Sequence, residues 1–182
     1  MKNHHSSLGA IILYTGILIG CASHKTKPSS DDPLTLAFKH AASVRVLSYS
    51  DRMYEPPVIE GEEQKDSVET ETVFRVVGDL RIAESTIKEE ITLDGAQRDS
   101  LLRLLQLNMC ETDGVAICYN PRHAILFYDS NDRPFSYIEI CFECTNYQTY
   151  GDFALDFCYE KSQAIRSLFQ SVGIEYFEVG ER

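Results

Sequence analysis

Short runs of apolar residues, some alternating with polar ones, stand out in this 182-residue chain and are typical of β-strands. The clearest two are His123–Tyr128 and Phe135–Phe142, which flank a polar turn. We therefore expect a central β-hairpin over residues 123–142. Three further strands are predicted upstream of it, at Ser43–Tyr49, Thr72–Val77 and Ile87–Leu93.

Two segments follow the period of an amphipathic helix. Residues 95–107 begin after Asp94, which together with Gln97 fits a capping box. Residues 160–172 end at Gly173, a residue type that favours the left-handed conformation after a helix. Two weaker predictions are a short helix over residues 34–42 and an edge strand over residues 174–179.

These elements predict one α+β domain over residues 34–182, with an antiparallel sheet of about four or five strands and two packed helices. About 150 residues are enough for one domain with a hydrophobic core. Residues 55–71 carry seven carboxylates and two prolines, which predicts an acidic, mobile surface loop. Residues 145–157 are aromatic and follow no clear period.

The register of the hairpin decides which of its residues share a face. If Tyr128 lies opposite Phe135, then Ile125 lies opposite Ile138 and His123 opposite Ile140. One face then holds Ile125, Phe127, Ile138, Ile140, Phe142 and Cys144. The other face holds Leu126, Tyr128, Phe135, Tyr137, Glu139 and Cys141. The same count brings Cys118 close to Cys144 at the open end of the hairpin.

The N-terminus has the pattern of a secretory signal, because Met1-Lys2 precede an uncharged apolar run from Leu8 to Gly20. That run is too short to cross a bilayer, which takes about 20 residues. It ends in Leu18-Ile19-Gly20-Cys21, which resembles the lipobox of bacterial lipoproteins. The resemblance implies removal of residues 1–20, lipidation of Cys21 with acyl chains such as palmitate, and a flexible tether over residues 21–33.

The expected location is therefore the bacterial cell envelope, with the lipid anchor as the contact to the membrane. Ala22 follows the lipidated cysteine, and in the sorting logic of bacterial lipoproteins this favours the outer membrane. The formal net charge of −11 argues against a nucleic-acid partner and against electrostatic adhesion to anionic head groups.

Five cysteines follow Cys21, and an oxidising envelope compartment favours disulfides among them. An odd number cannot all pair within the chain. The preferred pairs are Cys110 with Cys118 and Cys144 with Cys158, which leaves Cys141 as a free thiol. A Cys118–Cys144 link across the base of the hairpin is a close alternative.

Cys141-Phe-Glu-Cys144 has the spacing of a redox centre or of half a zinc site. A redox pair usually opens a helix, whereas this one ends a predicted strand and precedes poor helix sequence. On a continuing strand the two thiols would also point to opposite faces. We therefore expect no cofactor, with zinc as the alternative. The ligands of a zinc site would come from Cys118, Cys141, Cys144, Cys158 and His123.

His123 is one of two histidines in the predicted domain. No local catalytic signature accompanies it, so a hydrogen-bonded strand histidine is the favoured interpretation. The aromatic segment over residues 147–159 is a candidate contact surface, since exposed aromatic residues often anchor partners. A loop that packs onto the core through the same aromatic residues is slightly favoured.

Residues 118–144 resemble a stretch of bacterial envelope lipoproteins of unknown function, with Cys-Tyr-x-Pro-Arg before one strand and Cys-Phe-x-Cys after the next. The resemblance implies no activity and no functional residue. The sequence thus predicts a membrane-anchored envelope lipoprotein, most readily one with a non-enzymatic role in binding or envelope maintenance. The alternative is a thiol- or zinc-dependent envelope enzyme that uses Cys141 and Cys144.

Overall fold

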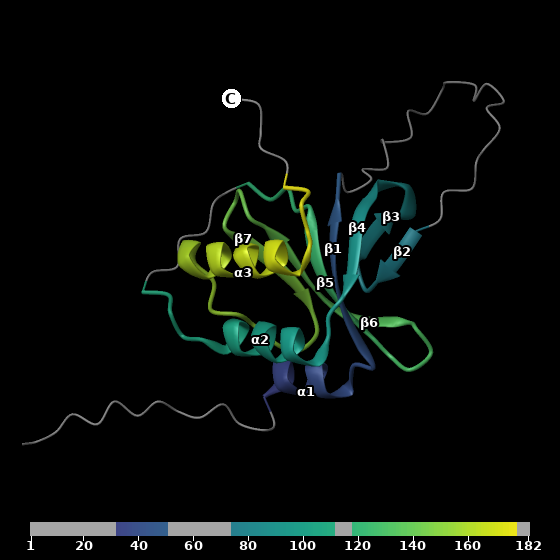
Figure 1. Cartoon of the computed structure of the whole chain (residues 1–182), viewed down its shortest axis with the longest axis horizontal. Helices are drawn as coiled ribbons and strands as arrows, with labels where there is room; N and C mark the ends of the chain where they lie inside the picture. Colours follow the sequence, from purple (N-terminus) through teal and green to yellow (C-terminus); the bar gives the residue numbers. More distant parts are fainter. Residues whose placement is uncertain (1–31, 51–73, 112–117, 178–182) are drawn as a thin grey trace, which may run out of the picture.

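The computed structural model describes residues 32–50, 74–111 and 118–177. Within these ranges the chain forms an antiparallel five-stranded sheet with the order β4-β1-β5-β6-β7 (Figure 1). The strands are β1 Ser43–Tyr49, β4 Ile87–Thr92, β5 His123–Tyr128, β6 Pro134–Cys141 and β7 Asn146–Tyr150. The predicted α+β class is confirmed.

Three helices accompany this sheet in the described part of the chain: α1 Pro33–His40, α2 Gly95–Gln106 and α3 Tyr159–Val172. The predicted capping box of α2 is present, since Asp94 accepts a hydrogen bond from the Gln97 amide and the Gln97 side chain accepts one from the Asp94 amide. Gly173 ends α3 with a φ of 111°, the left-handed conformation expected at that position.

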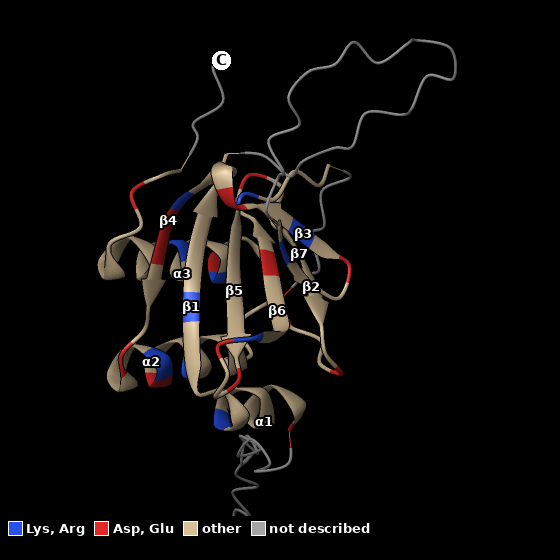
Figure 2. Ribbon diagram, turned by 90° about the vertical axis from the view of Figure 1, so that its right-hand side faces the viewer, with Lys and Arg blue, Asp and Glu red and all other residues tan. Residues whose placement is uncertain are grey.

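The sheet is covered on both faces. Helices α2 and α3 pack on one face, and a small hairpin of β2 Phe74–Val77 and β3 Leu80–Ala83 covers the other (Figures 1 and 2). The helix-side core includes Val46, Ile125 and Ile138. The hairpin-side core includes Leu47, Leu126 and Tyr137. The central strands are therefore buried on both sides.

The predicted hairpin register is confirmed over most of its length. His123 lies opposite Ile140 and Ile125 opposite Ile138, as the count from the turn required. At the turn itself Tyr128 pairs with Pro134 instead of Phe135, through an irregularity between Phe127 and Tyr128.

The strand membership differs from the prediction at several points. Phe74–Val77 does not join the main sheet, because a two-residue turn at Gly78-Asp79 pairs it with β3 instead. The fifth strand of the main sheet is β7, in a segment where no strand was predicted. Residues 174–177 form no strand. A register shift opposite Ser48/Tyr49 also turns Ile87 to the hairpin side, away from the side of Ile91 and Leu93.

The predicted signal peptide of residues 1–20, Cys21, most of the predicted tether and the predicted acidic loop of residues 55–71 lie outside the described residues. Across residues 32–50, 74–111 and 118–177, no helix is long and apolar enough to cross a membrane.

Docking of the small hairpin depends on Gly78. Its φ of 59° is left-handed, and a Cβ at this position would overlap the ring of Tyr150. The substitution Gly78→Ala should therefore lower the free energy of unfolding by about 1–3 kcal/mol, measured by urea denaturation.

Gly95→Ala is the matched control, since its Cβ would meet nothing within 4 Å. It should leave stability unchanged or raise it by up to about 1 kcal/mol. Equal effects of the two substitutions would contradict this role of Gly78.

Candidate functional site

A disulfide joins Cys110, which follows α2, to Cys158, the residue before α3. Their Cα atoms lie 5.5 Å apart across a sequence separation of 48 residues. The predicted pairs Cys110–Cys118 and Cys144–Cys158 are therefore wrong. The physical reason is the packing of α2 beside α3, which brings the end of one helix to the start of the other.

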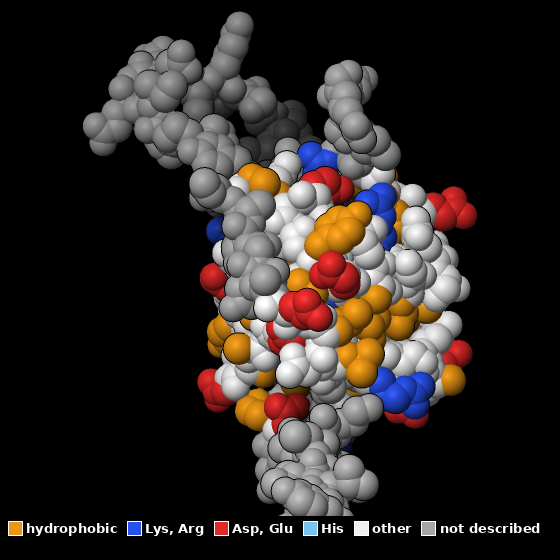
Figure 3. Space-filling view, turned by 90° about the vertical axis from the view of Figure 1, so that its left-hand side faces the viewer, with side chains coloured by type: hydrophobic (Ala, Val, Ile, Leu, Met, Phe, Trp, Pro, Cys, Tyr) orange, Lys and Arg blue, Asp and Glu red, His pale blue; other side chains and the backbone are white. Residues whose placement is uncertain are grey.

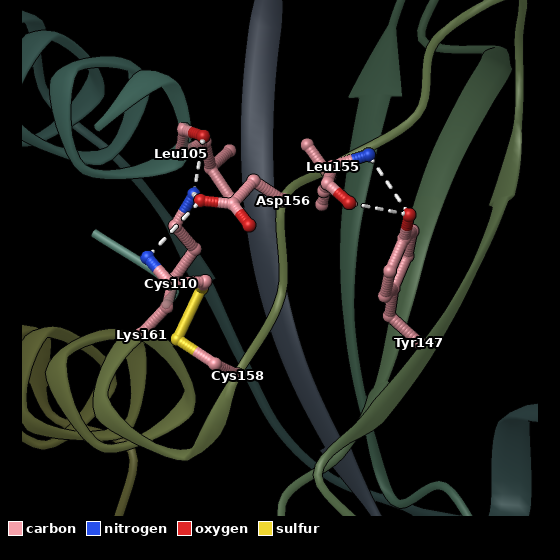
Figure 4. The surroundings of a disulfide bond; sticks show 7 residues. All are labelled: Leu105, Cys110, Tyr147, Leu155, Asp156, Cys158 and Lys161. Atoms are coloured by element: carbon pink, nitrogen blue, oxygen red, sulfur yellow. Dashed lines mark hydrogen bonds and ion pairs between the residues drawn. A yellow bond between two sulfur atoms is a disulfide. The ribbon is translucent and has the colours of Figure 1, made fainter. Parts of the chain in front are cut away.

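The disulfide lies beside an ion pair between the buried Lys161 and the half-buried Asp156 (Figure 4). The Asp156 carboxylate accepts a hydrogen bond from the backbone amide of Cys110 at 3.3 Å. The Lys161 ammonium donates to the carbonyl of Leu105 in the last turn of α2 at 3.1 Å and lies 3.8 Å from Asp156. Lys161 is fully buried, which lowers its pKa, while Asp156 acts in the opposite direction. This network ties α3 to the C-terminus of α2.

A cleft of about 320 Å³ opens next to this network. Its apolar walls include Leu34, Leu105 and Leu155, and Lys161 and Asp156 supply charged groups. On this side of the molecule, hydrophobic side chains gather next to acidic ones (Figure 3). Those that stay exposed near the ends of α2 and α3 are Leu107 at 53%, Met109 at 37% and Tyr159 at 62%.

Sequence reasoning missed Asp156 and Lys161. Lys161 could have been found from its spacing, because it lies four and eight residues before Ile165 and Phe169 on the apolar side of α3. A lysine buried there needs an acceptor or a carboxylate as partner. Asp156 gave no such signal, since it lies between β7 and α3 in a segment without regular structure.

The other three cysteines meet at the open end of the β5–β6 hairpin. The sulfur of Cys118 lies 2.8 Å from that of Cys144, and the Cys141 thiol donates to the carbonyl of Asn120 at 3.3 Å. Cys118 is exposed, whereas Cys141 and Cys144 are buried. The proximity expected from the hairpin register is present.

Cys141 and Cys144 do not lie on one continuing strand, so the expectation that they point to opposite faces of it does not apply. Strand β6 ends at Cys141, so Cys144 belongs to the turn towards β7 and not to a continuing strand. Thr145 has a left-handed φ of 47° in this turn, and the Cys144 sulfur lies 2.8 Å from that of Cys118.

The protonation of these thiols limits their chemistry. The hydrogen bond with Cys144 raises the pKa of Cys118. Burial raises the pKa of Cys144. Because the thiolate is the nucleophile and the metal ligand, raised pKa values make both thiols poor nucleophiles at neutral pH.

The residues proposed for zinc are not gathered into one site. Cys158 is bonded to Cys110, and His123 points into the helix-side core, where its ring contacts Phe142 and Phe169. In the part of the chain that the structure describes, no group of three His, Cys, Asp or Glu side chains is arranged to hold a metal ion.

Searches of protein-family models, curated proteins and solved structures give no match to this chain.

His123 is a buried strand histidine with a hydrogen bond, as expected. Its Nε2 atom lies 2.9 Å from the carbonyl oxygen of Tyr176, and its ring stacks on Phe177 at 4.6 Å. Nearby, the Glu89 carboxylate accepts hydrogen bonds from the backbone amides of Glu175 and Tyr176. The two side chains fasten residues 174–177 to the sheet.

The aromatic segment packs onto the core, which was the favoured interpretation. Phe153, Leu155 and Phe157 are buried in the helix-side core. The Tyr147 hydroxyl donates to the carbonyl of Leu155 and accepts from its amide, both at 2.8 Å (Figure 4). Among its aromatic residues, Tyr150 and Tyr159 stay exposed, and Tyr159 directly follows the disulfide-bonded Cys158 beside the cleft.

The burial of His123 predicts a stability that depends on pH. Burial lowers the pKa of His123 from 6.5 to about 4, and the nearby Arg166 and Arg122 act in the same direction. Glu89 and the carbonyl of Tyr176 oppose this shift. Between these pH values the unfolded chain binds a proton that the folded chain does not, so the free energy of unfolding should fall as pH drops from 6.5 towards 4.

The full loss from this group is about 3 kcal/mol. His123→Gln places an amide near the position of Nε2 and does not titrate, so it should remove this part of the pH dependence. The free energies of unfolding of the wild type and of His123→Gln are compared from denaturation curves between pH 6.5 and pH 5. Most carboxylates titrate below this range. The same slope in both proteins would exclude His123 as its source.

Proposed function

We propose that this chain is a lipoprotein of the bacterial cell envelope, anchored in the outer membrane through Cys21, and that its domain acts by binding. The observation that carries the envelope location is the Cys110–Cys158 disulfide. Disulfides persist in oxidising compartments and are rare in the cytosol. The signal pattern and the lipobox at Leu18–Cys21 support the same location.

The length of chain after the anchor limits how far the domain reaches from the membrane. Eleven residues lead from Cys21 to Asp32, where the described fold begins. Fully extended, they span at most about 40 Å. Asp32 and Leu34 line the cleft beside Lys161, so the cleft lies where the tether enters the domain.

The cleft and its surroundings favour a binding role. A concave site with apolar walls and a few charged groups is typical of ligand and peptide contacts. Leu107 lines the cleft and stays exposed, and the exposed Met109 and Tyr159 extend this apolar surface beyond the cleft. The partner that fits is a protein or peptide of the envelope with an apolar segment.

The thiol-dependent enzyme at Cys141 and Cys144 has weaker support. Catalytic thiols have a lowered pKa, produced by a helix N-terminus or a nearby cation. Here the pKa of Cys144 is raised, and the pair lies at the end of strand β6 and not at a helix N-terminus. The described residues also offer no ligand set for zinc.

Lipidation is tested by the substitution Cys21→Ser. The wild-type chain should incorporate labelled palmitate and fractionate with the outer membrane, whereas Cys21→Ser should do neither. Cys110→Ser is the control, because it removes another cysteine and leaves the anchor intact. A Cys21→Ser protein that still fractionates with membranes would count against the lipid anchor.

The contact surface is tested by in-cell photo-crosslinking from a reactive residue at position 109. We expect a discrete adduct that Leu107→Asp abolishes, because a carboxylate in an apolar contact is costly to bury. Val76→Asp is the matched control, since Val76 is similarly exposed, at 50%, on the small hairpin. An adduct that both substitutions weaken equally would place the contact elsewhere.

A further inference from the structure

Three cysteines remain outside the Cys110–Cys158 disulfide, and they lie together. Cys118 precedes β5, Cys141 ends β6 and Cys144 lies in the turn between β6 and β7. Only one pair among three thiols can be bonded at a time. The geometry distinguishes between the pairs.

The sulfur atoms of Cys118 and Cys144 are 2.8 Å apart. A shift of less than ~1 Å brings them to the ~2.0 Å of a disulfide bond. Cys141, in contrast, is fully buried and its thiol donates to the carbonyl of Asn120. We propose that Cys118 and Cys144 form a second disulfide, with Cys141 kept as a buried thiol.

Because Cys118 is exposed, it is the first of the two thiols to react when the disulfide forms. Its thiolate attacks the disulfide of an envelope thiol oxidase, and one sulfur of the oxidase leaves as a thiol. Cys144 then attacks the Cys118 sulfur of this mixed disulfide and releases the second oxidase sulfur. Two protein thiols become one disulfide, and the oxidase disulfide becomes two thiols. The inference rests on the proposed function, because it requires an oxidising compartment.

The raised pKa values of Cys118 and Cys144 are consistent with a stable disulfide between them. They slow the attack of the thiols at neutral pH, so that an oxidase speeds the reaction while a small disulfide such as oxidised glutathione still drives it. Once formed, the bond is hard to break by thiol exchange, because a thiol of high pKa is a poor leaving group. The bond is thus a structural link and not a catalytic couple.

The second disulfide would hold the segment before β5 against the end of the sheet. The Tyr119 hydroxyl in this segment donates to Glu139 at 2.9 Å, and the Tyr49 hydroxyl donates to the other oxygen of the same carboxylate at 2.7 Å. Glu139 is fully buried on β6. Holding Cys118 in place therefore keeps one of the hydroxyl donors that this buried carboxylate needs.

The test is a disulfide map of the full-length chain, extracted from membranes under denaturing, non-reducing conditions with a thiol-alkylating agent. We expect linked peptides for Cys110–Cys158 and Cys118–Cys144, with Cys141 alkylated. Alkylation of Cys118 and Cys144 in a chain whose Cys110–Cys158 bond is intact would overturn the inference. So would a linked Cys141–Cys144 peptide.

The same map on the purified, fully reduced chain after treatment with oxidised glutathione separates this inference from the proposed function. A chain fully alkylated in cells would refute the oxidising location, and the pairing would then be decided in vitro. Failure to link Cys118 with Cys144 under these conditions would overturn the inference.

Two variants complete the test. Cys141→Ser should keep both disulfides and show no alkylated thiol in the domain.

Cys118→Ser should lose one disulfide and lower Tm by roughly 5 to 15 °C, because the bond closes a long loop. Complete reduction of both proteins should remove this difference in Tm, since neither then contains the Cys118–Cys144 bond. A difference that persists after reduction would assign the loss to the serine and not to the bond.

Discussion

Burial of the central strands on both faces is the constraint on which the rest of this structure depends. Strands β1, β5 and β6 send apolar side chains into the helix-side core and into the hairpin-side core. A sheet of this kind is stable only while both covering layers remain in place, because loss of either exposes a continuous apolar surface. It also requires a partner for any polar group on these strands, as the two tyrosine hydroxyls on Glu139 show.

The covering layers are far apart in sequence, so specific contacts hold them together. Arg98 of α2 donates to the carbonyls of Phe38 and Ala41, which joins α2 to the end of α1. The Cys110–Cys158 disulfide links the ends of α2 and α3. On the other face, Arg75 of the small hairpin forms an ion pair with Glu90 of β4 at 2.8 Å. Each of these contacts joins two elements that are not consecutive in the chain.

The sequence predicted the features that depend on local contacts and missed those that depend on contacts between distant segments. The β5–β6 register and the capping box of Asp94 and Gln97 depend on neighbours in the chain, and both were predicted correctly apart from the turn. The pairing of Cys110 depends on how two helices pack, which spacing does not encode. Strand β7 was missed because an exposed edge strand needs few apolar residues.

The cysteines and the cleft differ in the same way, since one depends on local contacts and the other on long-range ones. The proximity of Cys118 and Cys144 came from the local register, whereas the cleft beside Lys161 is built from α1, α2 and the segment before α3, which meet only in the folded chain. In the proposed lipoprotein this has a consequence for orientation. The net charge of −11 for the whole chain disfavours contact with anionic head groups, and the proposed tether would join the domain beside the cleft. Under this proposal, a partner bound in the cleft would be held near the membrane by the anchor, within the reach of eleven residues.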